Sequence, residues 1–299
     1  MVQDNIRVIL DCDTRNEIDD QLAISYALGV GNLDVLGVIS VHDTVADGQT
    51  SVELYQAEAQ HIVKLCGRPD VPCWRGASRP METIDEAVES EGLDFLLAAA
   101  SEGPLTLVAT GPATDIAAFA LLAPSDVAKN VSILWAGGFP DPGTWARHKF
   151  GELNARADIH AWRRTFQSAR NLKVLPGWPA VATVAVRWRE FAASLKTLNS
   201  ELGNYLSDLT VEFCEAREAP DMDQVRPEKV LWDIVNVAAL SIPKMVRFVE
   251  LDLPHLDAAG APDWTRPVGS APFAMEVDAD AIIADFWTAL HSLPKVRER

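Results

Sequence analysis

Short apolar runs alternate along the chain with longer segments in which apolar residues recur every three or four positions. Compact runs rich in Val, Ile and Leu predict buried strands, and the longer spacing predicts helices. The predicted strands are residues 6–10, 34–41, 105–109, 131–136 and 172–175. The predicted helices are residues 21–28, 51–65, 115–122 and 277–293, and residues 200–240 are expected to be mostly helical.

The alternation of strand and helix predicts an α/β fold, with a mainly parallel central sheet flanked by helices on both faces in a Rossmann-like arrangement. Residues 252–272 are rich in proline and polar side chains, and we expect an irregular excursion there. No repeat or linker interrupts the sequence, so one domain is predicted over residues 1–299. Because such sheets bind ligands at the carboxyl ends of their strands, the residues after each strand are candidates for a site.

The chain is acidic, since its 299 residues include 43 Asp and Glu against 26 Lys and Arg, for a net charge of −17. This balance argues against binding to nucleic acid or to an anionic membrane surface, and it suits a cation or a neutral ligand. Four scattered cysteines without a CxxC pair, no signal-peptide pattern and no apolar stretch of roughly 18–20 residues predict a cytoplasmic protein with reduced thiols.

An acidic cluster follows the first predicted strand directly: Asp11, Asp13, Glu17, Asp19 and Asp20. Like charges at close range raise one another's pKa and repel, and a hard cation with oxygen ligands relieves that repulsion. A solvated loop at a helix N-terminus is the alternative, because the helix dipole also favours acidic residues there. The density of the cluster at a strand end favours a Ca²⁺ or Mg²⁺ site.

Four segments resemble motifs of the nucleoside hydrolase family. Asp11, Asp13, Asp19 and Asp20 resemble its N-terminal DxDxGxDD signature, although this turn is two residues longer and lacks the glycine. Residues 107–117 (LVATGPATDIA) resemble the TGPLTNLA segment, and residues 135–138 (WAGG) with 151–154 (GELN) resemble the MGG and AEFN segments. Residues 231–233 (LWD) resemble the late segment that completes a metal site.

The resemblance implies the nucleoside hydrolase fold and a Ca²⁺-dependent N-ribohydrolase that is often a dimer or tetramer. It assigns Ca²⁺ to Asp13, Asp20, Asp233 and the backbone carbonyl of Thr110, and it assigns the ribose to Asp19, Glu152 and Asn154. Asp13 would also accept the proton of the attacking water, and Asp11 would support the turn. Hard oxygen donors of this kind suit Ca²⁺, and a carboxylate suits general-base catalysis.

Many family members carry a His where this chain has Trp232. A tryptophan face can stack on a base, so we expect purine ribonucleosides to be preferred, although a core Trp is the alternative. Trp145 is predicted as a second base wall, ahead of Trp74 and Trp178. His42, after the second strand, is predicted to contact substrate or to be structural.

His148 could reach the base, because it lies between the WAGG and GELN segments. Residues 81–93 contain no His where the family has a His-rich loop, which leaves the proton donor to the base unidentified.

Two other functions fit parts of the pattern. Asp11 and Asp13 after an apolar strand resemble a haloacid-dehalogenase-like phosphatase, but Arg15 stands where that family needs Thr or Val. A nucleoside- or sugar-binding protein with the hydrolase fold would explain the missing proton donor. The full carboxylate set argues against it, since binding alone does not need all four of Asp13, Asp19, Asp20 and Asp233.

Overall fold

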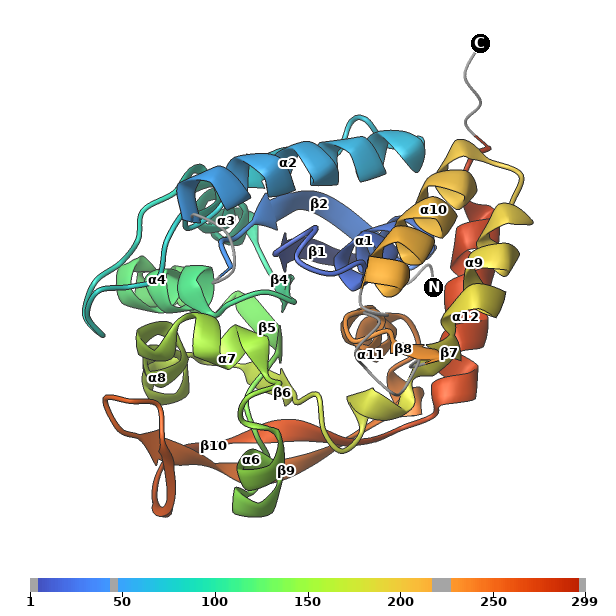
Figure 1. The fold of residues 1–299 in the computed structure, drawn as a ribbon. Coiled ribbons are helices and arrows are strands. Elements are labelled where there is room, and N and C mark those ends of the chain that lie inside the picture. Colours follow the sequence, from blue (N-terminus) through green and yellow to red (C-terminus); the bar gives the residue numbers. More distant parts are fainter. Residues whose placement is uncertain (1–4, 44–47, 217–226, 296–299) are drawn as a thin grey trace.

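The structure, a computed structural model, describes residues 5–43, 48–216 and 227–295, and an eight-stranded sheet lies at its centre (Figure 1). The strands lie in the order β3-β2-β1-β4-β5-β6-β10-β9, and every neighbouring pair is parallel except β10 and β9. Their bounds are β1 Ile6–Cys12, β2 Leu33–Ser40, β3 Cys73–Arg75, β4 Leu105–Ala109, β5 Val131–Ala136, β6 Leu172–Leu175, β9 Val246–Leu256 and β10 Pro262–Val277. The expectation of a mainly parallel central sheet is confirmed.

The strand order reverses direction at β1. From β1 the chain builds outward through β2 to β3, and it then returns to the other side of β1 to add β4, β5 and β6. In an open parallel sheet, a crevice forms outside the carboxyl ends of the two strands where the order reverses. The topology therefore places a crevice after β1 and β4, where the acidic cluster begins.

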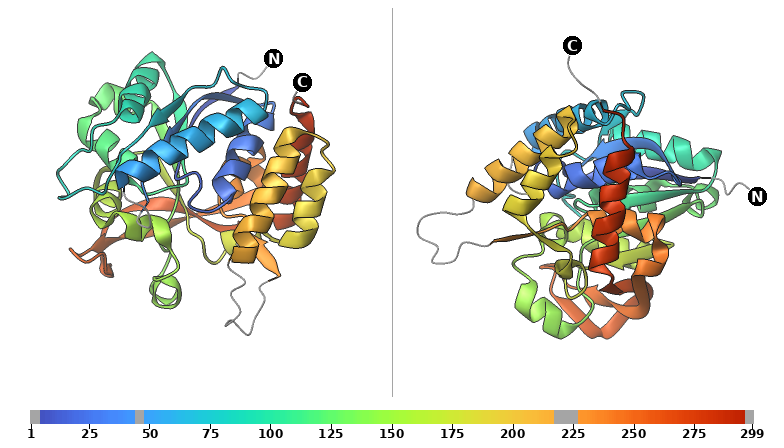
Figure 2. Two further views of the ribbon diagram at one scale, coloured as in Figure 1. Left: turned by 45° about the horizontal axis from the view of Figure 1, so that its top comes forward. Right: turned by 90° about the vertical axis from the view of Figure 1, so that its right-hand side faces the viewer.

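Helices cover both faces of the sheet. Their bounds are α1 Asp19–Gly29, α2 Gly48–Leu65, α3 Glu91–Glu102, α4 Thr114–Leu122, α5 Ser125–Ala128, α6 Pro142–His148, α7 Leu153–Ala157, α8 Ile159–Ser168, α9 Trp188–Lys196, α10 Glu201–Ala216, α11 Ile234–Ser241 and α12 Ala279–Ser292. One core packs beneath α1, α2 and α9 to α12, and a second packs beneath α3, α4 and α8. Figure 2 shows helices on both sides of the sheet. Across the described ranges, no helix is both long and apolar enough to span a bilayer.

The central strands have no polar face, because apolar cores cover both sides of the sheet. In β1, Val8 and Leu10 belong to the first core and Ile9 belongs to the second, and all three are buried. Strands buried on both faces are continuous apolar runs rather than alternating ones. This explains why compact runs in the sequence predicted β4, β5 and β6 with their observed bounds.

The expected excursion at residues 252–272 is wrong, because β9 and β10 form a long antiparallel hairpin there. β9 lies at the edge of the sheet, so most of its positions are exposed or only partly buried, and its sequence is more polar than that of a central strand. Pro267 lies where the register of the hairpin shifts, and proline is tolerated at such bulges and edges. Within the segment expected to be mostly helical, α10 and α11 are present, but Glu228–Val230 forms strand β8, which pairs with β7 (Ala185–Arg187) in a small separate sheet.

Candidate active site

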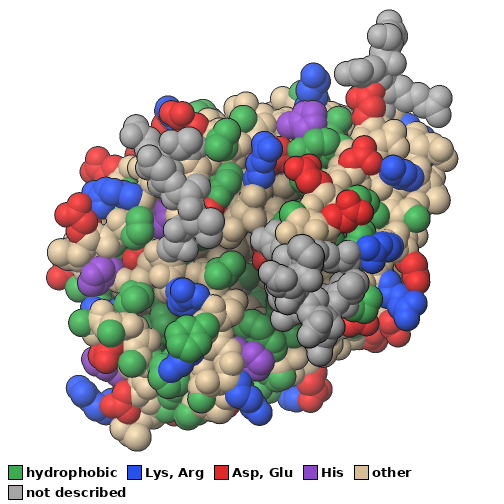
Figure 3. Space-filling model, viewed as in Figure 1, with side chains coloured by type: hydrophobic (Ala, Val, Ile, Leu, Met, Phe, Trp, Pro, Cys, Tyr) green, Lys and Arg blue, Asp and Glu red, His purple; other side chains and the backbone are tan. Residues whose placement is uncertain are grey.

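A pocket of about 270 Å³ lies at the carboxyl ends of β1, β4, β5 and β6, at the point where the strand order reverses. Figure 3 shows the face of the molecule seen in Figure 1, which is hollowed near its centre with hydrophobic side chains gathered around the hollow. Eight of the ten predicted site residues line the pocket: Asp13, Asp19, Asp20, Thr110, Glu152, Asn154, Trp232 and Asp233. The fold thus brings together residues from four distant parts of the sequence.

Three carboxyl groups line the pocket although each is almost fully buried. Asp13 follows β1, Asp20 lies in the first turn of α1, and Asp233 precedes α11. Burial raises the pKa of Asp13 well above its ordinary value, and the nearby charge of Asp20 and a hydrogen bond to its carboxyl group raise it further. The pKa of Asp233 is raised by burial and by the charges of Asp19, Asp20 and Asp13. A positive charge placed among them would be strongly favoured.

The turn between β1 and α1 is longer than the family signature, but it keeps an unusual backbone position. Arg15 has a φ of 97°, in a region that favours glycine, and the family pattern has its glycine in the corresponding turn. The amide N–H of Asn16 donates to the carbonyl of Asp13 (2.9 Å), and its side-chain amide donates to Asp13 Oδ2 (3.1 Å). These bonds fix the orientation of the Asp13 carboxylate at the start of the turn.

Thr110 ties the loop after β4 to the acidic cluster. Its amide N–H donates to the carbonyl of Asp11 (2.8 Å), and its hydroxyl donates to Asp20 Oδ1 (2.6 Å). A Cβ on Gly111 would lie 2.5 Å from the Val41 side chain, so glycine allows this close approach. The Asp11 atom in the contacts with Thr110 is the backbone carbonyl, so the supporting role of the Asp11 side chain stays a prediction. Among the described residues, the Asp11 side-chain oxygens are buried without a hydrogen-bond partner.

Asn154 and Glu152 approach the pocket from the segment before α8. The Asn154 side-chain amide donates to the carbonyls of Thr110 (2.6 Å) and Ala136 (2.9 Å). Glu152 caps α7 by accepting the Ala155 N–H at Oε2 (2.8 Å). Burial raises the pKa of Glu152 to about 8.

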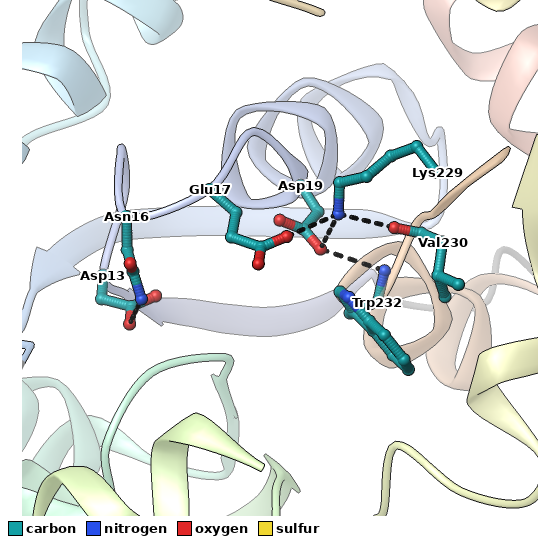
Figure 4. Close-up of polar contacts among 7 residues, drawn as sticks. All are labelled: Asp13, Asn16, Glu17, Asp19, Lys229, Val230 and Trp232. Carbon is teal, nitrogen blue, oxygen red and sulfur yellow. Dashed lines mark hydrogen bonds and ion pairs between the residues drawn. The ribbon is translucent and has the colours of Figure 1, made fainter. Parts of the chain in front are cut away.

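A buried lysine stands behind the acidic turn, and the sequence analysis missed it. Lys229 Nζ lies 2.7 Å from Glu17 Oε2, 3.1 Å from Asp19 Oδ2 and 2.7 Å from the carbonyl of Val230 (Figure 4). The N–H of Trp232 also donates to Asp19 Oδ2 (3.2 Å). The only signal in the sequence was a lysine close to the LWD segment. Its two carboxylate partners, Glu17 and Asp19, precede it by more than two hundred residues.

Two tryptophans form an aromatic corner of the pocket. Trp178 and Trp232 both line it, with ring centroids 5.2 Å apart and planes at 61°. The His148 ring stacks on Trp178 with centroids 4.3 Å apart, and it does not line the pocket itself. Trp178, which the sequence analysis ranked below Trp145, is therefore the tryptophan that meets Trp232.

Trp145 and His42, both predicted to contact substrate, lie outside the pocket lining. Trp145 packs against the second core, and Lys149 Nζ lies 4.6 Å from its ring centroid. The His42 side chain is fully buried, and its Nε2 shares a hydrogen bond of 2.8 Å with the Thr114 hydroxyl. Burial lowers its pKa to about 4, so the ring is neutral near pH 7. Trp145 and His42 are close to the motifs in the sequence, but neither side chain lines the pocket.

The family model of the inosine-uridine preferring nucleoside hydrolases matches residues 8–284. The chain belongs to the nucleoside hydrolase family. Members of that family are N-ribohydrolases, and the predicted class of enzyme is therefore supported.

Nucleoside hydrolases similar to this chain differ in their base preference. The pyrimidine-specific ribonucleoside hydrolase RihA from Klebsiella pneumoniae is 29% identical, over 92% of this chain and 95% of that protein. A purine-preferring ribonucleoside hydrolase from Gardnerella vaginalis has a similar structure, with a TM-score of 0.72 and 23% identity over 95% of this chain and 98% of that one. A plant nucleoside hydrolase gives a TM-score of 0.73 with 20% identity, over 96% and 99% of the two chains. The two structural similarities establish the shared fold.

The donor set of this nucleoside hydrolase fits a hard cation. Asp13, Asp20, Asp233 and the Thr110 carbonyl offer only oxygen atoms, which Ca²⁺ and Mg²⁺ prefer. Over residues 5–43, 48–216 and 227–295, however, no three His, Cys, Asp or Glu side chains are arranged closely enough to form a metal site. Asp13 and Asp20 instead accept hydrogen bonds from Asn16 and Thr110. The chemistry of the donors therefore suits a hard cation.

Proposed function

We propose that this chain is a Ca²⁺-dependent hydrolase that cleaves the N-ribosidic bond of ribonucleosides, with a preference for purine bases. The observation that carries the proposal is the convergence of Asp13, Asp20, Asp233 and Thr110 in one buried pocket beside an aromatic corner. In this proposal, those three carboxylates and the Thr110 carbonyl hold Ca²⁺. When bound, the cation supplies positive charge that lowers the pKa of the carboxyl groups and of a nearby water.

Each residue then has a distinct role. Asp13 accepts a proton from water as the water oxygen bonds to the anomeric carbon. Asp19, Glu152 and Asn154 bind the ribose hydroxyls. The bond from sugar to base breaks with its electron pair going to the base nitrogen, which takes a proton from solvent. The developing positive charge on the sugar is stabilised by the surrounding carboxylates.

The aromatic corner supports the purine preference. Trp178 and Trp232 line the pocket and present two large apolar faces, and stacking of a base on an aromatic ring is worth about 1–3 kcal/mol in nucleic-acid systems. A purine offers a larger face than a pyrimidine. None of the six histidines of the chain lines the pocket, so stacking on tryptophan is the interaction that we assign to the base.

A reducing-sugar assay on purine and pyrimidine ribonucleosides tests the proposal directly, with parallel samples in EDTA and in added Ca²⁺. We expect ribose release that EDTA abolishes and Ca²⁺ restores, with purines cleaved faster. Faster cleavage of pyrimidines would overturn the base preference and leave the reaction standing. Tight nucleoside binding by calorimetry without ribose release would instead support a binding protein.

A second measurement tests the aromatic corner. Trp232→His should shift the relative rates away from purines, because it replaces the indole ring with a smaller imidazole ring for the base to stack on. Trp145→His is the matched control, since Trp145 lies outside the pocket lining, and it should leave the ranking of bases unchanged. Equal rankings in both variants would remove the stacking role of Trp232.

A further inference from the structure

Lys229 is a buried cation whose hydrogen-bonding capacity is used entirely within the protein. Its side chain is 8% exposed, and an ammonium group has three protons to donate. Glu17 Oε2, Asp19 Oδ2 and the Val230 carbonyl lie 2.7, 3.1 and 2.7 Å from Nζ and account for all three. A lysine that is saturated in this way affects a ligand only through the groups that it holds.

The group in the pocket that it holds most closely is Asp19. Both hydrogen bonds of the Asp19 carboxylate, from Lys229 Nζ and from the Trp232 N–H, end on the same oxygen, Oδ2. Asp19 lines the pocket, and in Figure 4 its second oxygen points away from the lysine. One oxygen is therefore committed to the protein, and the other is available to a ligand.

The same contact joins the two parts of the pocket. Asp19 begins α1, whereas Trp232 belongs to the segment between β8 and α11. Because Lys229 and the Trp232 N–H share Asp19 Oδ2, a change in the Asp19 rotamer would disturb the backbone that carries the Trp232 ring. Without the lysine, Glu17 and Asp19 would also become two neighbouring carboxylates with no cation between them, and their repulsion would favour such a change.

We propose that Lys229 is a positioning residue for sugar recognition. It fixes Asp19 Oδ2, directs Oδ1 toward the ribose and holds the Trp232 backbone against the start of α1. The inference rests on the proposed function, in which Asp19 binds ribose hydroxyls. It adds a residue outside the pocket lining and explains what the longer acidic turn does, since Glu17 in that turn supplies the second carboxylate that holds the lysine.

The test compares Lys229→Met with the wild-type protein on one ribonucleoside and on its 2′-deoxy and 3′-deoxy analogues. The variant should lower kcat/KM for the ribonucleoside about tenfold or more. It should lower kcat/KM less than about threefold for an analogue that lacks the hydroxyl bound by Asp19, because the interaction is already missing there. A purely structural role would lower all three rates alike, and that result would overturn the proposal.

Two further variants make the outcome unambiguous. Lys196→Met is the matched control, because it removes an exposed ion pair of the same length, 3.1 Å to Asp208, and it should change none of the rates. Lys229→Gln keeps two N–H donors without the charge, so it should give an intermediate loss with the same dependence on the hydroxyl, and it carries the test if Lys229→Met does not fold. Equal kcat/KM values for Lys229→Gln and wild type on every substrate would overturn the proposal.

The experiment also separates this inference from the proposed function. A wild-type protein that releases no ribose in the presence of Ca²⁺ overturns the proposed function and the inference together. If the wild-type protein is active and Lys229→Met lowers kcat/KM equally for the ribonucleoside and its deoxy analogues, the inference alone is overturned.

Discussion

Asp115 and Asp158 are as deeply buried as Asp13 and Asp20, but their surroundings differ. Both oxygens of Asp115 accept the Ala77 N–H, at 3.1 and 3.0 Å. Asp158 accepts the N–H groups of Ala161 and Met81, each at 2.8 Å, and the Thr114 hydroxyl at 2.9 Å. These carboxylates are solvated by the protein itself, as buried acids in a stable interior must be.

The carboxylates of the pocket are surrounded mainly by one another. Asp13 accepts the Asn16 side-chain amide, Asp20 accepts the Thr110 hydroxyl and a hydrogen bond from the Cys12 thiol, and a further hydrogen bond joins Asp13 to Asp20. The charges of neighbouring acids raise the pKa of both Asp13 and Asp233. The comparison shows that burial alone does not mark a functional acid. Asp115 and Asp158 have their own donors, whereas Asp13 and Asp233 are surrounded mainly by like charge.

The largest difference between the two groups of carboxylates is expected in catalysis. Asp13→Ala should reduce kcat by about a thousandfold or more, which corresponds to roughly 4 kcal/mol in the barrier, because the proton acceptor is lost. The measurement is ribose release, with circular dichroism to show that the fold is intact. Activity within tenfold of wild type would sink the assigned role.

Substitutions in the two groups of buried carboxylates should affect the free energy of unfolding differently. Asp158→Ala leaves buried donors without partners and should lower the free energy of unfolding by about 3 kcal/mol. Asp13→Asn in metal-free protein removes repulsion and should leave the stability unchanged or raise it by about 1 kcal/mol. Urea denaturation measures both, and equal destabilisation by the two substitutions would remove the distinction drawn here.

Calcium should stabilise the folded protein only through the carboxylates of the pocket, Asp13, Asp20 and Asp233. At a free concentration one hundred times Kd, Ca²⁺ should raise the free energy of unfolding by about 2.7 kcal/mol, and EDTA should reverse the change. Asp233→Asn should abolish this dependence, while Asp115→Asn, which lowers the baseline stability, should retain it. A thermal shift titration tests this, and a Ca²⁺ response that survives in Asp233→Asn would contradict the assignment of Asp233.

The expected effect on the pH dependence of stability is smaller per pH unit than the calcium response, and it concerns Glu152. This group accepts the backbone N–H of Ala155, and burial raises its pKa to about 8 from its ordinary value of 4.5. Because the folded state binds the proton more tightly, the contribution of Glu152 is fully present below about pH 4.5 and is lost as the pH rises through 8. The slope approaches about 1.4 kcal/mol per pH unit within that window.

The measurement is the free energy of unfolding in metal-free buffers from pH 5 to 8, for wild type and for Glu152→Gln. Glutamine does not titrate, so the difference between the two proteins isolates the carboxyl group. Parallel curves would show that Glu152 is not perturbed by burial.

Local patterns predicted the central sheet because its strands are buried on both faces. The run at residues 105–109 became β4 with the same bounds, and the acidic turn after β1 could be recognised as a site because all of its residues are contiguous. The hairpin of β9 and β10 was missed since its strands lie near the sheet edge and carry prolines. Lys229 was missed because the residue that explains it, Asp19, is remote in sequence.

The ion pair between Lys229 and Glu17 has a consequence for synthesis of the protein. The two residues are separated by 212 positions, so the acidic turn leaves the ribosome long before its lysine. At about 5–20 residues per second, the interval is roughly 10–40 s. During that time the five acidic side chains next to the apolar β1 segment, with Arg15 among them, lack Lys229. The excess negative charge opposes association between the exposed strands of neighbouring nascent chains, as gatekeeper residues do, until the C-terminal part supplies the lysine that pairs with Glu17 and Asp19.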